Sequence, residues 1–135
     1  MSMLVDTSVW SLAFRRDAPP DLGEIGALRL ALERGDSIVC TGLVLQEVLQ
    51  GYSGAKARER LLDKFGALPM INPDRVDHVE AAELRNHCRR HGVQLGTIDA
   101  LIAQLCIRYG LTLLSTDGDF KHAAKYCRLR NWGAP

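Results

Sequence analysis

The stretch MSMLVDTSVW (residues 1–10) sets the expectation for the whole chain. Residues 3–5 form a short, fully apolar strand pattern that stops at Asp6. The two hydroxyl residues that follow, Thr7 and Ser8, can cap a helix that begins near Val9. A carboxylate at the carboxyl end of a central strand lies where open α/β sheets build their sites. Asp, Thr and Ser are also common at helix starts, so this stretch alone leaves both roles of Asp6 open.

Length and composition predict one globular domain over residues 1–135. The chain is 47% hydrophobic and 24% charged, and it is long enough for one substantial core but too short for two. No apolar run approaches the ~20 residues of a membrane span. Asp6 interrupts the only apolar stretch near the start before the hydrophobic region of a signal peptide could form. We therefore expect a cytoplasmic protein without membrane contact.

Short apolar runs alternate with helical patterns along the chain. The predicted strands are residues 3–5, 37–40, 67–71, 111–115 and 126–129, and the predicted helices are residues 9–14, 22–34, 42–52, 53–65, 74–91, 98–109 and 121–124. The strands are apolar without alternation, and no tight hairpin signal occurs. This predicts a mainly parallel sheet of four to five strands with helices on both faces, a three-layer α/β/α fold.

Acidic residues recur at one edge of the predicted sheet. The four are Asp6, Glu47, Asp99 and Asp117, and Asp119 follows two residues after the last of them. Each has an ordinary structural explanation; Asp99, for example, lies in the first turn of its helix, where the macrodipole favours a carboxylate. In a parallel sheet, however, strands end and the following helices begin at the same edge. A shared site explains the four positions better than independent placement does.

Such a cluster predicts a divalent metal site. Carboxylates held within a few ångströms repel one another and would take up protons without a compensating cation. Oxygen ligands without His or Cys select Mg²⁺ or Mn²⁺, and such ions activate water and orient a phosphodiester. Thr7, Ser8 and Thr116 are candidates for hydrogen bonds to the ligands or their waters.

The charge distribution is compatible with a phosphate backbone as substrate. The formal net charge of the chain is +1, from 17 basic and 16 acidic residues. If the four clustered acids belong to the metal site, 12 acidic residues remain against 17 basic ones, so the rest of the chain has a charge of +5. An ordinary mixed surface explains the same numbers. Arg89, Arg90 and Lys121 are the candidate RNA-backbone contacts, although the helix dipole alone also explains the two arginines at a helix end.

The cysteines do not predict a zinc or disulfide protein. The four cysteines include no CxxC pair, and Cys40 and Cys106 lie in apolar runs, which favours buried free thiols. His87, Cys88 and His91 could ligate zinc. A structural zinc site needs four well-spaced ligands, and no second cluster is present.

Four fragments in a fixed order connect the chain to a known family. They are LVDTSVW (residues 4–10), TGLVLQEVLQG (41–51), GTIDALIAQL (96–105) and LTLLSTDGDF (111–120). With them the chain resembles the PIN-domain ribonucleases over nearly its whole length, and most closely the VapC toxins of bacterial toxin–antitoxin pairs. Each fragment is weak alone, but the ordered set is specific.

The resemblance implies a function and a set of partners. It assigns metal binding to Asp6, Glu47, Asp99 and Asp117, with Asp119 as a fifth candidate and Thr116 as the adjacent hydroxyl. It implies a Mg²⁺- or Mn²⁺-dependent endoribonuclease of the two-metal type that cuts tRNA or rRNA. It further implies a homodimer and a VapB-like antitoxin, which blocks the site and helps bind promoter DNA.

Two other functions fit the same fragments. One is a PIN nuclease of RNA maturation that is not a toxin, and the other is a catalytically silent RNA-binding or assembly module. The complete acidic set argues against the silent module. Cys106 stands where the family often has Ala, and the tail after Arg130 is divergent, so the dimer and antitoxin contacts are less firmly implied than the acids.

Overall fold

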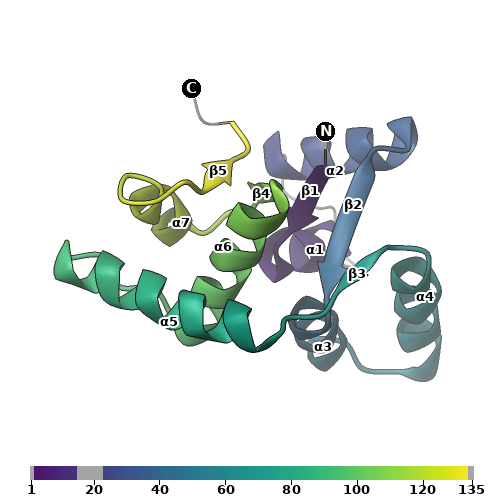
Figure 1. The fold of residues 1–135 in the computed structure, drawn as a ribbon. Helices are drawn as coiled ribbons and strands as arrows, with labels where there is room; N and C mark the ends of the chain where they lie inside the picture. Colours follow the sequence, from purple (N-terminus) through teal and green to yellow (C-terminus); the bar gives the residue numbers. More distant parts are fainter. Residues whose placement is uncertain (1, 15–22, 134–135) are drawn as a thin grey trace.

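The computed structural model describes residues 2–14 and 23–133 of the 135-residue chain. Along these residues, strands and helices alternate in the following order (Figure 1): β1 Ser2–Val5, α1 Thr7–Ala13, α2 Gly23–Arg34, β2 Ser37–Thr41, α3 Gly42–Gln50, α4 Ala55–Gly66, β3 Met70–Ile71, α5 Arg75–Arg90, α6 Thr97–Tyr109, β4 Thr112–Leu114, α7 Gly118–Ala123 and β5 Arg130–Asn131. No helix within these two ranges is both long and apolar enough to cross a membrane.

The strands form one parallel sheet in the order β3-β2-β1-β4-β5. The chain moves from β1 through β2 to β3 in one direction, and then returns past β1 to β4 and β5. Because crossovers between parallel strands are right-handed, this reversal puts α1 to α4 on one face and α5 to α7 on the other. The predicted α/β fold with a mainly parallel sheet is confirmed. The reversal lies at β1, where open α/β sheets place their ligand sites.

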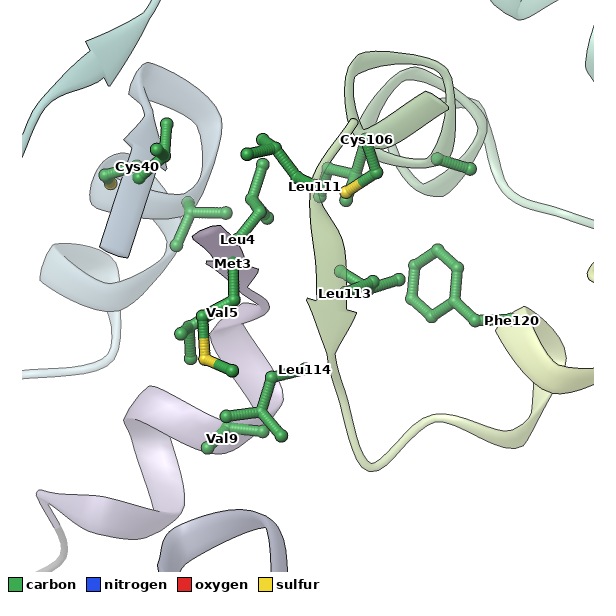
Figure 2. Packing of buried hydrophobic residues seen from close by; sticks show 14 of the residues in the cluster. Met3, Leu4, Val5, Val9, Cys40, Cys106, Leu111, Leu113, Leu114 and Phe120 are labelled. Atoms are coloured by element: carbon green, nitrogen blue, oxygen red, sulfur yellow. The ribbon is translucent and has the colours of Figure 1, made fainter. Parts of the chain in front are cut away.

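The core explains why β1 is central. Met3, Leu4 and Val5 are at most 4% exposed, and β1 pairs with both β2 and β4. Figure 2 shows these residues beside Leu113 and Leu114 of β4, with the Phe120 ring turned toward Leu113. A strand buried on both faces reads as an unbroken apolar run, and residues 3–5 have that pattern.

The predicted start is confirmed for one helix and wrong for another. Thr41 caps α3 as expected, because Val44 N donates to Thr41 Oγ1 at 3.2 Å. The prediction for α1 was wrong: the helix begins at Thr7 instead of near Val9, with Asp6 at the cap position, so Thr7 and Ser8 are not the caps. The predicted start of the second helix, Leu22, lies outside the described residues.

The last predicted strand was placed wrongly. Residues 126–129 form turns and irregular structure, whereas β5 is Arg130–Asn131, which pairs with Thr112 and Leu113 of β4. Trp132 N continues this edge by donating to Leu113 O at 2.8 Å. The predicted strand 67–71 shortens to Met70–Ile71, because the first two residues complete the turn after α4. The helix predicted at 121–124 is α7, which starts earlier, at Gly118.

The cysteines are free thiols, as predicted. Cys40 and Cys106 are buried, and burial raises the pKa of Cys40 to about 11 and, together with the charge of Asp6, that of Cys106 to about 12. His87 and His91 pack their rings 4.7 Å apart, and His91 stacks on Tyr126. The histidines at the end of α5 therefore serve as packing residues in this structure.

Candidate active site

Asp6 is the most buried of the candidate acids. The residue is 7% exposed at the end of β1, and its backbone N–H donates to Leu114 O at 2.9 Å, which extends the β1–β4 pairing by one residue. Asp6 Oδ2 accepts hydrogen bonds from Ser8 Oγ and Ser115 Oγ, both at 2.9 Å. A buried carboxylate without such donors would be strongly disfavoured, so the two hydroxyls hold Asp6 as an oriented acceptor.

Ser115 is a site residue that the sequence reasoning missed. Its Oγ also accepts from Asp117 N at 3.0 Å and lies 3.3 Å from Ser8 Oγ. The sequence points to the neighbouring Thr116 instead, but Thr116 is exposed, and its backbone N–H donates to Ser8 Oγ at 3.1 Å. Only the strand register identifies Ser115: Val5 pairs with Leu114, so the next residues, Asp6 and Ser115, are neighbours across the two strands.

Glu47 enters the site from α3. Thr7 Oγ1, in the first turn of α1, donates to Glu47 Oε1 at 3.2 Å, across 40 residues of sequence. Both side chains are half-buried. The capped start of α3 at the end of β2 fixes the helix, and Glu47 follows in its second turn. Thr7 thus contacts a candidate acid, while Ser8 contacts another.

Asp99 lies near enough to the other four candidate acids for their negative charges to act on its carboxyl group. It lies half-buried in the first turn of α6, where Gly96 forms the cap position. The pKa of Asp99 is raised to about 6, first by burial and then by the nearby negative charges of Asp6, Asp117, Glu47 and Asp119, in that order. The structure therefore brings all five predicted acids into one electrostatic neighbourhood.

Asp117 and Asp119 form the outer side of this cluster. Asp117 caps α7, and its Oδ1 accepts from Asp119 N at 2.9 Å. Asp117 is half-buried, whereas Asp119 is exposed. A cap bond through Oδ1 and a place in the acidic cluster are compatible, because a carboxylate has two oxygens and several acceptor sites.

The five acids suit a divalent cation by their chemistry. As the side chains stand, no three His, Cys, Asp or Glu residues among the described ones are close enough to enclose an ion. The donors are all hard oxygens, which Mg²⁺ and Mn²⁺ prefer. The pKa of Asp99 is raised first by burial and then by the four neighbouring carboxylates, so the acids contribute to the shift as like charges do. A cation would offset that charge and draw the carboxylates together.

The three candidate RNA-contact residues make no direct polar contact with the acids in the described part of the chain. Arg89 and Arg90 are exposed in the last turn of α5, and Lys121 is exposed in α7. By contrast, Arg85 Nε donates to Leu95 O at 2.9 Å and has a structural role.

Comparison with known proteins agrees with this geometry. The PIN domain family model matches residues 3–126. Ribonuclease VapC11 of Mycobacterium tuberculosis is 31% identical over 130 residues, which make up 95% of this chain and 96% of that protein. The structure of VapBC2 from Rickettsia felis bound to a DNA fragment from their promoter aligns with a TM-score of 0.73 at 24% identity, over 98% of this chain and 99% of that chain.

A second structure has the same fold. It is the sarcin-ricin loop cleaving toxin VapC20 of Mycobacterium tuberculosis, with a TM-score of 0.69 at 20% identity, over 95% of this chain and 98% of that chain. The resemblance inferred from the ordered motifs is thereby confirmed. The match of the family model to most of the chain, and the 31% identity to a VapC ribonuclease, show that this chain belongs to the PIN-domain family and, within it, to the VapC ribonucleases.

Proposed function

We propose that this chain is a Mg²⁺- or Mn²⁺-dependent endoribonuclease and the toxin of a VapBC-type pair. The observation that carries the proposal is the convergence of four other carboxylates on Asp99 at the carboxyl edge of the sheet. The names of the relatives support ribonuclease activity. A cluster of like charges around the buried Asp6 is repulsive and has no evident structural benefit, whereas a metal-dependent nuclease requires such a cluster.

In this mechanism the chain holds and orients the metal ligands. Asp6, Glu47, Asp99 and Asp117, with Asp119 at the rim, would bind the ions. When bound, divalent ions supply a Lewis acid that polarises the phosphodiester and lowers the pKa of the attacking water.

The hydroxyl residues of the chain fix these carboxylates in place. Ser8 and Ser115 fix Oδ2 of Asp6, and Thr7 fixes Oε1 of Glu47. These hydrogen bonds restrict the carboxylates to few orientations. The side chains therefore lose less conformational entropy when a metal ion and RNA bind.

The proposed substrate and partners follow the relatives. VapC20 is described as cleaving the sarcin-ricin loop, which supports structured rRNA, or tRNA, as the target class here. Complexes named VapBC, one of them with promoter DNA, support a VapB-like antitoxin through which promoter DNA is bound. We further propose a cytoplasmic homodimer, in which Arg89, Arg90 and Lys121 contact the RNA backbone.

The test is cleavage by matched carboxylate variants. Asp99→Asn removes a charge from the acidic cluster, and we expect RNA cleavage to fall by at least about 100-fold. Asp63→Asn makes the same change on an exposed residue of α4 and should cleave as the wild type does. Circular dichroism checks that both variants fold.

Two results would contradict the proposal. Cleavage that continues in excess EDTA would exclude the metal mechanism, and an active Asp99→Asn variant would exclude the site. Mapping RNA 5′ ends after brief induction of the wild type, against Asp6→Asn as the inactive control, then identifies the target. Wild-type expression that neither arrests growth nor cuts RNA would remove the toxin assignment.

A further inference from the structure

The end of α5 and the chain that follows α7 form a charged surface that contains none of the acids. His91, one residue beyond α5, stacks its ring on that of Tyr126, with centroids 4.6 Å apart and planes inclined by 24°. In Figure 1 this end of α5 lies below the loop between α7 and β5. Four exposed cations accompany the two rings, and we call these six residues the basic face: Arg89, Arg90, His91, Lys125, Tyr126 and Arg128.

The two segments that meet at the basic face contain no acid. Residues 84–98 and 120–133 contain seven Lys and Arg residues and no Asp or Glu. The residues one turn before Arg89 and Arg90 on α5 are basic or neutral, so neither arginine has an acidic partner on its own helix. Among the described residues, none of the four cations forms an ion pair. Their charge is therefore uncompensated within this part of the chain.

The helix dipole explains only part of this arrangement. Arg89 and Arg90 lie in the last turn of α5, where cations are favoured. Arg128 lies five residues beyond the end of α7, whereas the dipole acts only within the last turn. The dipole also gives no reason for an aromatic ring among the cations, and Tyr126 is 37% exposed. An anionic partner accounts for both features.

The two rings of the basic face also carry polar atoms. A backbone carbonyl only accepts, so the 2.9 Å contact of His91 Nδ1 with His87 O places the proton on Nδ1 and makes Nε2 an acceptor. The Tyr126 hydroxyl both donates and accepts. Phenol and imidazole groups of this kind form hydrogen bonds with a ribose 2′-hydroxyl. An RNA stem presents such hydroxyls in its wide minor groove, together with phosphates on two strands.

The basic face is connected to the acidic cluster through α7. Asp117 caps the start of this helix, and Lys125 follows soon after its end. The six residues of the helix and their flanks span about 10 Å. A folded RNA with its cut at the acids is large enough to contact both surfaces at once.

We propose that the basic face binds a helical stem of the RNA that is cut at the acids. The cations contact phosphates of the two strands, and Tyr126 and His91 form hydrogen bonds with 2′-hydroxyls. This deepens the proposed function and rests on it, because it assigns to the nuclease a folded substrate and a contact that distinguishes RNA from DNA. A stem is favoured over an acidic protein because it accounts for the polar rings as well as the cations.

Binding without cleavage tests the basic face separately from the nuclease activity. The probes are a fluorescent RNA hairpin with a stem of about 12 base pairs and the DNA hairpin of the same sequence, measured by anisotropy in EDTA. The variant is Arg89→Gln/Arg90→Gln/Lys125→Gln/Arg128→Gln. We expect its affinity for the RNA hairpin to fall at least about 10-fold. The slope of log affinity against log salt concentration should lose about three units, since each phosphate contact on a duplex contributes about 0.9.

A matched variant controls for net charge. Arg29→Gln/Arg34→Gln/Arg58→Gln/Arg75→Gln removes the same charge from exposed positions outside the basic face. Its affinity for the RNA hairpin should stay within about 2-fold of that of the wild type, because these residues contact no phosphate in the proposed complex. Equal loss in the two quadruple variants would reduce the effect to net charge and overturn the proposal.

Tyr126→Phe tests the contact with the 2′-hydroxyl. It keeps the ring and every charge, so it is informative even if the quadruple variant folds poorly. We expect its affinity for the RNA hairpin to fall about 5-fold, the size of one lost hydrogen bond, and its affinity for the DNA hairpin to stay within about 2-fold. An unchanged ratio of RNA to DNA affinity would overturn the assignment to RNA.

A polyglutamate peptide represents an acidic protein partner. If the basic-face variant loses this peptide but keeps the RNA hairpin, the face docks a protein and the proposal is wrong. A wild type that binds the hairpin through the basic face but cleaves no RNA with Mg²⁺ or Mn²⁺ would refute the proposed nuclease function alone. A wild type that cleaves RNA, with hairpin binding unchanged in the basic-face variant, would refute the basic face alone.

Discussion

Ser115 and Thr116 are adjacent hydroxyl residues with different surroundings. Ser115 Oγ donates to Asp6 Oδ2 and accepts from Asp117 N, so one hydroxyl orients two candidate metal ligands. Thr116 is exposed and contacts Ser8 through its backbone. We predict that Ser115→Ala lowers RNA cleavage by about 10-fold or more, because groups that orient metal ligands have effects of that size.

Two controls accompany this prediction, each measured as the rate of cleavage of one RNA at saturating Mg²⁺. Ser115→Thr keeps the hydroxyl and should retain most of the activity. Thr116→Ala removes a hydroxyl at the neighbouring position and should cleave like the wild type. A larger loss in Thr116→Ala than in Ser115→Ala would contradict the assignment.

Asp99 links the site to the pH dependence of stability. Its pKa is raised from 3.8 to about 6 in the folded protein by burial and by four acidic neighbours. The folded state therefore holds this proton more tightly than the unfolded state does. The stabilisation is complete below about pH 4 and is lost as the pH rises through about 6.

We predict that the Tm of the metal-free wild type falls between about pH 4 and about pH 7 relative to that of Asp99→Asn, which has no such titration. Thermal melts in EDTA across that range measure the difference. At neutral pH, added Mg²⁺ should raise the wild-type Tm and affect Asp99→Asn much less, because the ion replaces the missing counter-charge. Parallel pH profiles for the two proteins would show that Asp99 is an ordinary surface acid.

At the scale of the elements, the local sequence was enough to predict the strands that are covered on both faces of the sheet. The strands β1, β2 and β4 are buried over most of their length, at residues 3–5, 38–41 and 113–114, so each is visible as a short, mainly apolar run. The acids could then be placed from topology, since Asp6 and Asp117 follow strands that are neighbours in a parallel sheet. These are the features that a short stretch of sequence carries by itself.

The features that were missed depend on partners far along the chain. β5 consists of Arg130 and Asn131, which carry no apolar signal and become a strand only because β4 leaves an edge to pair with. Asn131 Nδ2 also donates to Phe120 O at 3.1 Å, which anchors this edge against α7. The role of Ser115 depends in the same way on the register between β1 and β4. Pairing between segments that are far apart in the chain is seen in the structure, but the residue types of each segment alone do not predict it.

Asp77 is a further example, and it bears on the site. It is fully buried in the first turn of α5, where it forms a capping box with Asp74. Arg108 Nη1, near the end of α6, donates to Asp77 Oδ2 at 2.8 Å. A charge-assisted hydrogen bond of this kind holds α5 against α6. The buried acid of α5 thereby supports the helix that carries Asp99, although it is not itself part of the cluster.

On the whole molecule, one exposed apolar surface fits the proposed homodimer. Val76 and Val79 of α5 are 54% and 53% exposed, and Ile98 at the start of α6 is 40% exposed. Beside them is a groove of about 450 Å³ that Ala82, Ile98 and Leu101 help to line. A second copy of the chain that covered this surface would bury valines that are otherwise in water, at a gain of about 25 cal/mol for each Å².

We predict that Val76→Glu/Val79→Glu weakens self-association of the protein. Two like charges on one turn of α5 would have to be buried without partners, so the dimer should dissociate at concentrations at which the wild type remains paired. Leu30→Glu places a charge on an exposed leucine of α2, which is 44% exposed, and should leave the dimer intact. Sedimentation velocity over a concentration series separates the two variants. If both variants remain dimeric, the copies meet through another surface; if the wild type is monomeric throughout, the proposed homodimer is wrong.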